Sequence, residues 1–263
     1  MRCRLVGSEM CIRDSLYSDY HQDTLSYSKY RFVAEDYAIS YCYSVSLLKE
    51  MQAQQKALAK DGLLLYTYPE KSFQRQRNHL SDIFTSQWDK NKGFIVDMDE
   101  DHPKKSLHEQ SKNYCYVHFS THGELNDVEP NLSFLRMRTA SGEELLLYLY
   151  EIYNTRLNAE MVVTSACETG IGRFFNGEGI MSLARGFSYA GARSIVTTLW
   201  SVQEAETYEI LNLFYQYLGE GIPKDLALYK AKKEYLLNNP SVELNPYYWS
   251  GIIPIGNMAG LSL

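Results

Sequence analysis

The sequence predicts an α/β domain in which a mainly parallel β-sheet carries helices on both faces. Short apolar segments rich in Val, Ile and Leu alternate with longer segments of helical character along most of the 263 residues. This alternation indicates parallel strands joined by crossover helices. A composition of 45% hydrophobic and 22% charged residues is typical of a globular protein with a large core. In such sheets, binding sites lie beyond the carboxyl ends of the strands, so residues that directly follow strands are the first candidates.

The first fifteen residues, MRCRLVGSEMCIRDS, stand apart from the rest of the chain. They lack the continuous apolar stretch of a signal peptide. The string resembles a translated sequencing adapter carried over from assembled environmental DNA. We therefore expect residues 1–15 to be an assembly artefact or a disordered terminus, with Cys3 and Cys11 foreign to the native protein. Residues 16–36 are polar and aromatic, which indicates a connector from a missing upstream region.

The N-terminal part of the domain is expected over residues 37–110. Residues 37–60 are predicted to be helical, because their second half is rich in Leu, Lys, Glu, Gln and Ala. The apolar segment 62–69 predicts a buried strand that ends at Pro69. The remaining expected elements are a helix over 72–90, a short strand over 93–98, and a charged turn that leads into a helix within 97–112.

The second part, residues 111–263, shows the alternation more clearly. Ile180, Leu183, Ala184 and Phe187 follow helical spacing, which predicts a helix that ends at Gly191. The β-branched run 193–200 predicts a buried strand. The other expected elements are strands over 114–120, 132–137, 142–149 and 159–166, a short helix over 150–156, two helices after residue 200, and a final edge strand within 245–256.

Composition excludes several classes of protein. A net charge of −6 without a clustered basic face argues against binding to nucleic acid. The five cysteines lack C-x-x-C spacing, which argues against a disulfide framework or a thiolate zinc site and favours a reducing cytoplasm. No segment approaches the roughly 20 apolar residues of a transmembrane helix. We expect a cytoplasmic protein without metal or organic cofactor that contacts neither nucleic acid nor membrane; its cysteines are Cys3, Cys11, Cys42, Cys115 and Cys167.

The candidate chemistry lies in His122 and Cys167, 45 residues apart at the ends of two predicted strands. A thiol attacks well only as thiolate, and a neighbouring imidazole can take its proton. The attacked carbonyl then needs hydrogen-bond donors for its developing negative charge. The backbone N–H groups of Gly123 and Cys167 are the candidates for this oxyanion hole. Each residue alone also fits a structural role, since cysteine often behaves as a small core hydrophobe.

Other motifs fit the sequence less well. His118 and His122 have the spacing of a metal pair on a helix, but this segment is predicted to be a strand. In a strand the two rings lie roughly 13 Å apart, too far to share one ion. The glycines of ETGIGRFFNGEG match neither the dinucleotide-binding nor the P-loop pattern. The sequence contains no G-x-S-x-G elbow, which argues against a serine hydrolase.

The segment from Tyr114 to Gly256 resembles the CHAT family of caspase-like cysteine peptidases, and residues 37–69 resemble it more loosely. The similarity lies in YVHFSTHG, AEMVVTSACETGIG, GEGIMSLARGFSYAGA, RSIVTTLW and NPYYWSGIIPIG. The resemblance implies a caspase-like and separase-like α/β fold over residues 37–263, with 111–263 as the catalytic portion. It also implies that tetratricopeptide repeats precede the domain.

The resemblance further implies roles for individual residues. The His of THG and the Cys of SACETG form the catalytic dyad of the family, which maps onto His122 and Cys167. Ser165 stands where caspases proper have Gln. In the related separases, an acidic residue after a similar LW strand lines the pocket for the basic residue that precedes the cut. Glu204 matches that place approximately, although the dipole of a helix also favours acids in its first turn.

We therefore expect a bacterial, cytoplasmic cysteine endopeptidase that cleaves a protein substrate and is regulated by a protein partner or by upstream repeats. Cys167 is the expected nucleophile and His122 the general base. The sequence offers no convincing third residue to orient His122, so we expect a dyad. Two alternatives stay open: a catalytically latent caspase-like scaffold for protein assembly, and an enzyme that uses the same dyad on a small-molecule acyl substrate.

Overall fold

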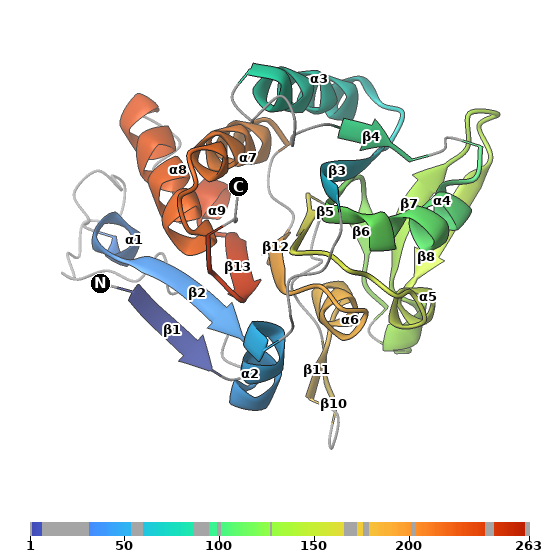
Figure 1. Cartoon of the computed structure of the whole chain (residues 1–263), viewed down its shortest axis with the longest axis horizontal. Coiled ribbons are helices and arrows are strands. Elements are labelled where there is room, and N and C mark those ends of the chain that lie inside the picture. The colour runs from blue at the N-terminus through green and yellow to red at the C-terminus, as the bar shows by residue number, and fades with distance from the viewer. Residues whose placement is uncertain are drawn as a thin grey trace.

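The centre of the molecule is an eight-stranded sheet with the strand order β1-β2-β13-β12-β9-β5-β3-β4 (Figure 1). This computed structural model describes residues 2–6, 32–53, 60–86, 95–98, 101–126, 128–165, 173–175, 179–200, 204–239 and 245–260. Neighbouring strands run parallel, except for the antiparallel pair β12 and β13. The predicted α/β fold with a mainly parallel sheet is confirmed. The strands are β1 (Arg2–Val6), β2 (Ala38–Cys42), β3 (Lys60–Thr67), β4 (Ile95–Asp97), β5 (Tyr114–Ser120), β9 (Met161–Thr164), β12 (Ser194–Thr198) and β13 (Ile252–Gly256).

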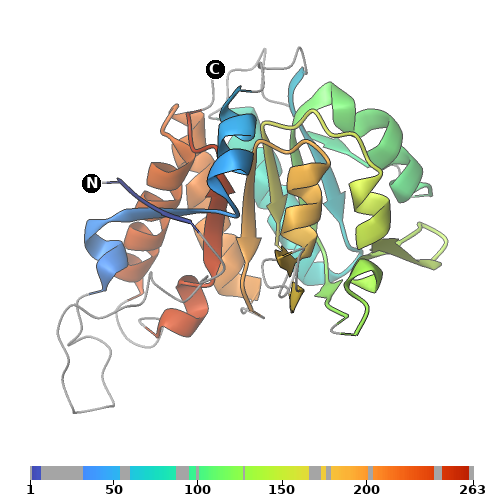
Figure 2. The same ribbon diagram turned by 90° about the horizontal axis from the view of Figure 1, so that it is seen from below.

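Helices cover both faces of this sheet, as Figures 1 and 2 show. One face carries α3 (Lys71–Ser86), α7 (Glu204–Gly219), α8 (Lys224–Asn238) and α9 (Pro246–Trp249). The other face carries α2 (Val45–Ala53), α5 (Leu149–Tyr153) and α6 (Leu183–Tyr189). The remaining helical elements are α1 (Val33–Asp36), α4 (Pro103–Gln110), and the 3₁₀ turns Ser111–Asn113 and Pro130–Leu132. Among the described helices, none has the length and apolar character that a membrane span requires.

Two hydrophobic cores result, one on each side of the sheet. Successive residues of a strand point to opposite faces, and β3 shows this directly. Leu63 and Leu65 pack in the core under α7 and α8, whereas Leu64 packs in the core under α5 and α6. All three side chains are fully buried. Burial on both faces explains why the central strands are apolar without alternation.

Two smaller sheets lie beside the main one. β6 (Gly123–Glu124), β7 (Phe134–Arg138) and β8 (Glu144–Tyr148) form an antiparallel sheet, and β10 (Arg173–Phe175) pairs with β11 (Gly179–Met181). The turn between β7 and β8 contains Gly142 with φ of 89°, a conformation that glycine adopts without strain. The strands predicted over 132–137 and 142–149 are confirmed as β7 and β8.

From Leu183 onward, the helix predicted to end at Gly191 is also confirmed, whereas Ile180 lies in β11 rather than in the helix. α6 ends at Tyr189, and Gly191 has φ of 112°. A Cβ atom at Gly191 would lie 2.5 Å from the carbonyl oxygen of Leu157, which excludes larger residues. The turn therefore fixes how β12 enters the sheet.

Three expectations differ from the structure. Residues 38–42 form β2 rather than a helix, because all five side chains are buried in the sheet, where tertiary packing outweighs helix propensity. β13 is not an edge strand, since it lies between β2 and β12. Within the segment expected to be artefactual or disordered, Arg2–Val6 form β1 and pair with β2. The adapter origin of residues 1–15 stays a prediction.

Candidate active site

The strands that lead to His122 and Cys167 are direct neighbours in the sheet. β5 and β9 run parallel with Phe119 opposite Thr164, and the Ser165 N–H donates to the Phe119 carbonyl at 3.0 Å. His122 follows the end of β5 by two residues. Residues 166–172, which include Cys167, lie outside the described part of the chain. The site is therefore described from the His122 side.

The His122 ring is held by aromatic neighbours but remains open to solvent. Tyr68 and Phe73 contact it edge to face, with ring centroids 5.3 and 5.0 Å from the imidazole. The His122 carbonyl accepts a hydrogen bond from the Arg136 N–H at 2.8 Å, which ties the backbone to β7. The side chain is 36% exposed. This arrangement fixes the plane of the ring while leaving an edge available for proton transfer.

Glu70 is a site residue that the sequence analysis missed. Its Oε2 lies 3.6 Å from His122 Nε2, and its side chain is 49% exposed. This distance is longer than a hydrogen bond and suits an ion pair with a protonated imidazole. Glu70 follows β3 by three residues, so the rule that sites gather at carboxyl ends of strands could have found it. Applying this rule to Glu70 requires knowing that β3 lies next to β5, which the sequence does not reveal.

Gly123 and Glu204 lie in different parts of this edge. Gly123 begins β6 and stands opposite Leu135 of β7. Glu204 begins α7 and lines a groove of about 550 Å³ between α3 and α7. The groove adjoins the histidine through Phe73, whose ring centroid lies 5.0 Å from that of His122 and 6.2 Å from that of Tyr208, a groove residue.

Burial and the carboxylate of Glu204 both affect the ionisation of Tyr208 inside the groove. Burial raises the pKa of the Tyr208 phenol, and the negative charge of Glu204 raises it further. Tyr208 is therefore protonated and neutral at physiological pH. Among the described residues, its buried hydroxyl has no hydrogen-bond partner. The groove thus holds a neutral phenol beside the carboxylate of Glu204.

His118, the other histidine of this strand, is part of a buried polar chain. The Tyr215 hydroxyl lies 3.1 Å from Nδ1 of His118, and Nε2 lies 3.1 Å from Ser165 Oγ. Burial lowers the pKa of His118 to about 3, so the ring stays neutral. Ser165 Oγ also donates to the Phe119 carbonyl at 3.2 Å. His118 therefore supports the end of β9, whereas His122 faces solvent.

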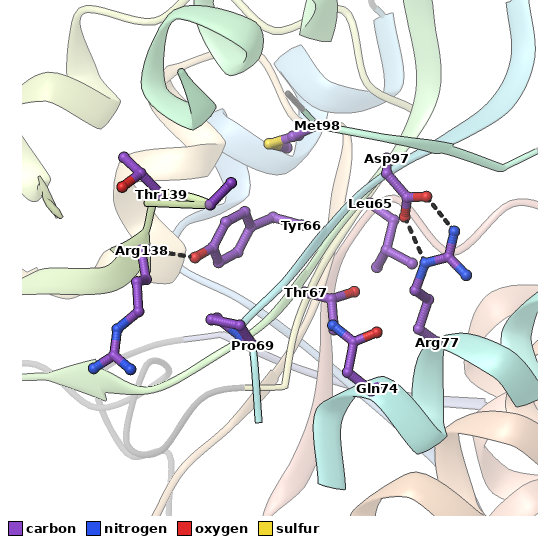
Figure 3. A pocket seen from close by; sticks show the side chains of 11 residues that line it. Leu65, Tyr66, Thr67, Pro69, Gln74, Arg77, Asp97, Met98, Arg138 and Thr139 are labelled. Carbon is purple, nitrogen blue, oxygen red and sulfur yellow. Dashed lines mark hydrogen bonds and ion pairs between the residues drawn. The ribbon is translucent and has the colours of Figure 1, made fainter. Parts of the chain in front are cut away.

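A small cavity of about 60 Å³ lies at the same edge, at the ends of β3 and β4 (Figure 3). Arg77 and Asp97 form an ion pair there, with Arg77 Nε 2.9 Å from Asp97 Oδ1. The Tyr66 hydroxyl accepts a hydrogen bond from the Arg138 N–H at 2.7 Å. The volume is close to that of two water molecules. The cavity is also lined by Arg138, and its small volume leaves no room for a peptide side chain beside the site.

Comparison with solved structures defines the class of fold. Separase in the Saccharomyces cerevisiae separase–securin complex matches with a TM-score of 0.56 at 13% identity, over 84% of this chain and 14% of that chain. The Arg-specific cysteine proteinase gingipain R matches with a TM-score of 0.57 at 9% identity, over 85% of this chain and 55% of that chain. The fold is therefore that of the caspase-like cysteine peptidases.

Comparison with sequences defines the family. The CHAT domain model matches residues 21–257, and the chain belongs to the CHAT domain family. Tetratricopeptide repeat protein 28 of Mus musculus is 30% identical over 114 residues, and that of Homo sapiens is 27% identical over 115 residues. These matches cover 43% and 44% of this chain but only 4% of each relative.

Proposed function

We propose that this CHAT domain is a cysteine endopeptidase in which Cys167 attacks the peptide carbonyl. His122 removes the proton of the thiol and later gives it to the leaving amine, and water then releases the acyl group from sulfur. The observation that carries this proposal is the adjacency of β5 and β9, which end at the same edge of the sheet. Cys167 follows β9 by three residues, and His122 follows β5 by two. The segments that carry the proposed nucleophile and base therefore leave the sheet from adjacent strand ends.

Glu70 is proposed to stabilise the imidazolium that forms when His122 takes the proton. Its carboxylate approaches Nε2, which leaves Nδ1 to receive the proton from the thiol. Because both side chains are substantially exposed, solvent screens this interaction, and it contributes modestly. The dyad expected from the sequence thus becomes a dyad assisted by a carboxylate.

The backbone N–H groups of Gly123 and Cys167 are proposed to form the oxyanion hole. The attacked carbonyl oxygen becomes an anion in the tetrahedral intermediate, and each aligned donor lowers its energy by about 3–4 kcal/mol. Gly123 directly follows the proposed base, so its N–H moves with the backbone that positions His122. The same tie to β7 that fixes the His122 carbonyl therefore restricts Gly123 as well.

Glu204 is proposed to favour Arg or Lys in the residue before the cut. Two observations support this: Glu204 lines the groove that adjoins His122, and the similar fold of gingipain R belongs to an Arg-specific proteinase. Peptides that differ only at this residue test it. Glu204→Lys should abolish the preference for a basic residue, whereas Glu220→Lys at the exposed end of the helix should keep it. An unchanged preference in Glu204→Lys removes Glu204 from the pocket.

A thiol-directed peptide probe tests the proposed activity. A peptidyl acyloxymethyl ketone should label the wild-type chain once, and Cys167→Ala should abolish the labelling. Cys42→Ala is the matched control, because Cys42 is buried in β2. Labelling that persists in Cys167→Ala contradicts the assignment. A folded wild-type protein that is never labelled indicates instead the latent scaffold, with a partner or upstream repeats needed for activity.

A further inference from the structure

The groove between α3 and α7 contains a buried side chain whose hydrogen-bonding groups are only half used. Gln76 of α3 is 1% exposed and lines the groove. Its Oε1 accepts a hydrogen bond from Ser120 Oγ and lies 3.5 Å from Ser165 Oγ. Within the described ranges, its Nε2 has no acceptor. An unpaired buried donor costs about 1–3 kcal/mol, so this group indicates a ligand that accepts a hydrogen bond.

The opposite wall of the groove carries the complementary group. Asn212 of α7 lines the groove, and its Oδ1 is shielded from solvent. No donor reaches this oxygen among the residues that the structure describes. The two walls together therefore offer one donor and one acceptor for a ligand between them.

The other residues of the groove restrict the chemistry of its ligand. Arg75 and His79 line it from α3, and Glu204 and Glu209 line it from α7. A strongly anionic ligand would meet two carboxylates, and a purely apolar one would leave the donor and acceptor unpaired. An extended polypeptide fits, because its main chain presents N–H and C=O groups toward opposite sides. A volume of about 550 Å³ lies within the range of ordinary ligand sites.

We propose that this groove binds an extended segment of the substrate polypeptide through its main chain. Gln76 Nε2 donates to a peptide carbonyl, and Asn212 Oδ1 accepts from a peptide N–H. The identity of the segment as substrate rests on the proposed function. Gln76 also connects the groove to the candidate site, since its hydrogen-bond donor Ser120 stands two residues before His122. Its Oε1 also lies 3.5 Å from Ser165, which stands two residues before Cys167.

Peptide binding to the full chain with His122→Ala tests the proposal, because bound peptides are then not cut. A library of acetylated and amidated hexapeptides is selected on this protein, and dissociation constants are measured by calorimetry. Gln76→Met removes the donor and should weaken binding about threefold to tenfold, the range of one net hydrogen bond. Gln74→Met, the same change at an exposed position of α3, should alter binding less than twofold.

Backbone esters locate the contact within the peptide. Replacing one amide by an ester weakens the carbonyl of that bond as an acceptor. At the position that contacts Gln76, the ester should weaken binding severalfold in the protein with an intact groove. In Gln76→Met the same ester should have no further effect. A double-mutant cycle measures this coupling between Gln76 and the peptide bond. Asn212→Leu on the other wall gives an independent readout if Gln76→Met does not fold.

The outcomes separate this inference from the proposed function. Three results would overturn the proposed peptide-binding role of the groove. They are equal binding to the intact groove and to Gln76→Met, equal ester effects in both proteins, and a library without any binder. Peptides that bind with the expected coupling but are never cut by the wild-type chain support the groove and contradict the peptidase. Peptides that are cut, but whose binding ignores both Gln76 and Asn212, support the peptidase and overturn the groove.

Discussion

The two edges of the central sheet hold their charged side chains in opposite ways. At the amino ends of β9 and β12, Glu160 accepts hydrogen bonds from Lys224 at 3.0 Å and from Arg193 at 2.6 Å. Lys224 is fully buried, and its Nζ also donates to the carbonyls of Asn257 and Ala259. Protein atoms thus satisfy both oxygens of Glu160 and three bonds of the Lys224 ammonium, as buried charges require.

At the carboxyl ends of β3 and β5, Glu70 and His122 are only loosely paired, although Arg77 and Asp97 at the same edge form a close ion pair. Glu70 and His122 are 3.6 Å apart and face solvent. In the part of the chain that the structure describes, the buried Nε2 of Gln76 has no acceptor. Under the proposed function, the amino edge maintains the fold, whereas Glu70, His122 and Gln76 at the carboxyl edge act on the substrate. Substitutions at the two edges should therefore affect different properties of the molecule.

The largest expected effect comes from the proposed base at the carboxyl edge. His122→Ala should lower kcat/KM about 10²- to 10⁴-fold, the usual contribution of a general base. Because the ring is substantially exposed, the unfolding free energy should change by less than about 1 kcal/mol. Peptide hydrolysis and urea unfolding measure the two quantities. His108→Ala, an exposed histidine on α4, should change neither; a stability loss that matches the activity loss would place His122 among structural residues.

The amino edge should show the reverse pattern. Lys224→Met leaves Glu160 with one cation fewer in a buried site, so the unfolding free energy should fall by about 3–5 kcal/mol. Lys233→Met, an exposed change on the same helix, should cost less than about 0.5 kcal/mol. Activity per folded molecule should remain at the wild-type level. Lost activity without lost stability would break the proposed division between the edges.

Acid should destabilise the protein through His118, which lies between the two edges. Its pKa is about 3 in the folded state against an ordinary value of 6.5, because burial disfavours the charged ring. Below pH 6.5 the unfolded chain therefore binds a proton that the folded protein does not, and stability falls with pH down to about 3. The contribution reaches about 1.4 kcal/mol per pH unit. Urea unfolding of His118→Gln between pH 7 and 4 should show a correspondingly smaller slope; an unchanged slope would contradict this account.

The smallest effect is expected at Glu70. Glu70→Gln removes the charge that faces the imidazolium, and a screened pair of this kind is worth at most about 1 kcal/mol. We expect kcat/KM to fall about twofold to fivefold, and the difference from wild type to shrink in 1 M salt. Glu124→Gln serves as an exposed control at the same edge. A loss of a hundredfold would show that Glu70 does more than stabilise the imidazolium.

Much of the fold was predictable because its central strands are apolar and β-branched. β5 and β12 occupy the segments predicted for them, since burial on both faces requires uninterrupted apolar residues. β2 was missed because its five residues directly precede a segment of strong helix formers. Local helix propensity contains no information about its pairing with β13, which is distant in the sequence. The interior place of β13 was missed for the same reason, since it depends on β2 as a neighbour.

The candidate site was predictable only where single residues follow strands. His122 stood out because it follows an apolar run by two residues, and Glu204 because it approximately matches the place of an acidic residue in the separases. Glu70 and Gln76 gained their meaning from contacts between elements: β3 lies beside β5, and α3 lies against α7. Such contacts depend on the order of strands in the sheet, which local patterns do not encode.

The pH dependence of Cys167 alkylation tests the central claim, that His122 and Cys167 meet at one edge of the sheet, most directly. Iodoacetamide reacts with the thiolate, and the described cysteines of the domain core, Cys42 and Cys115, are buried. In the wild-type chain, the rate at Cys167 should stay high well below pH 8.5, the ordinary thiol pKa, because the imidazole takes the proton. His122→Ala should move the midpoint to about pH 8.5. Identical profiles in the two proteins would contradict the account.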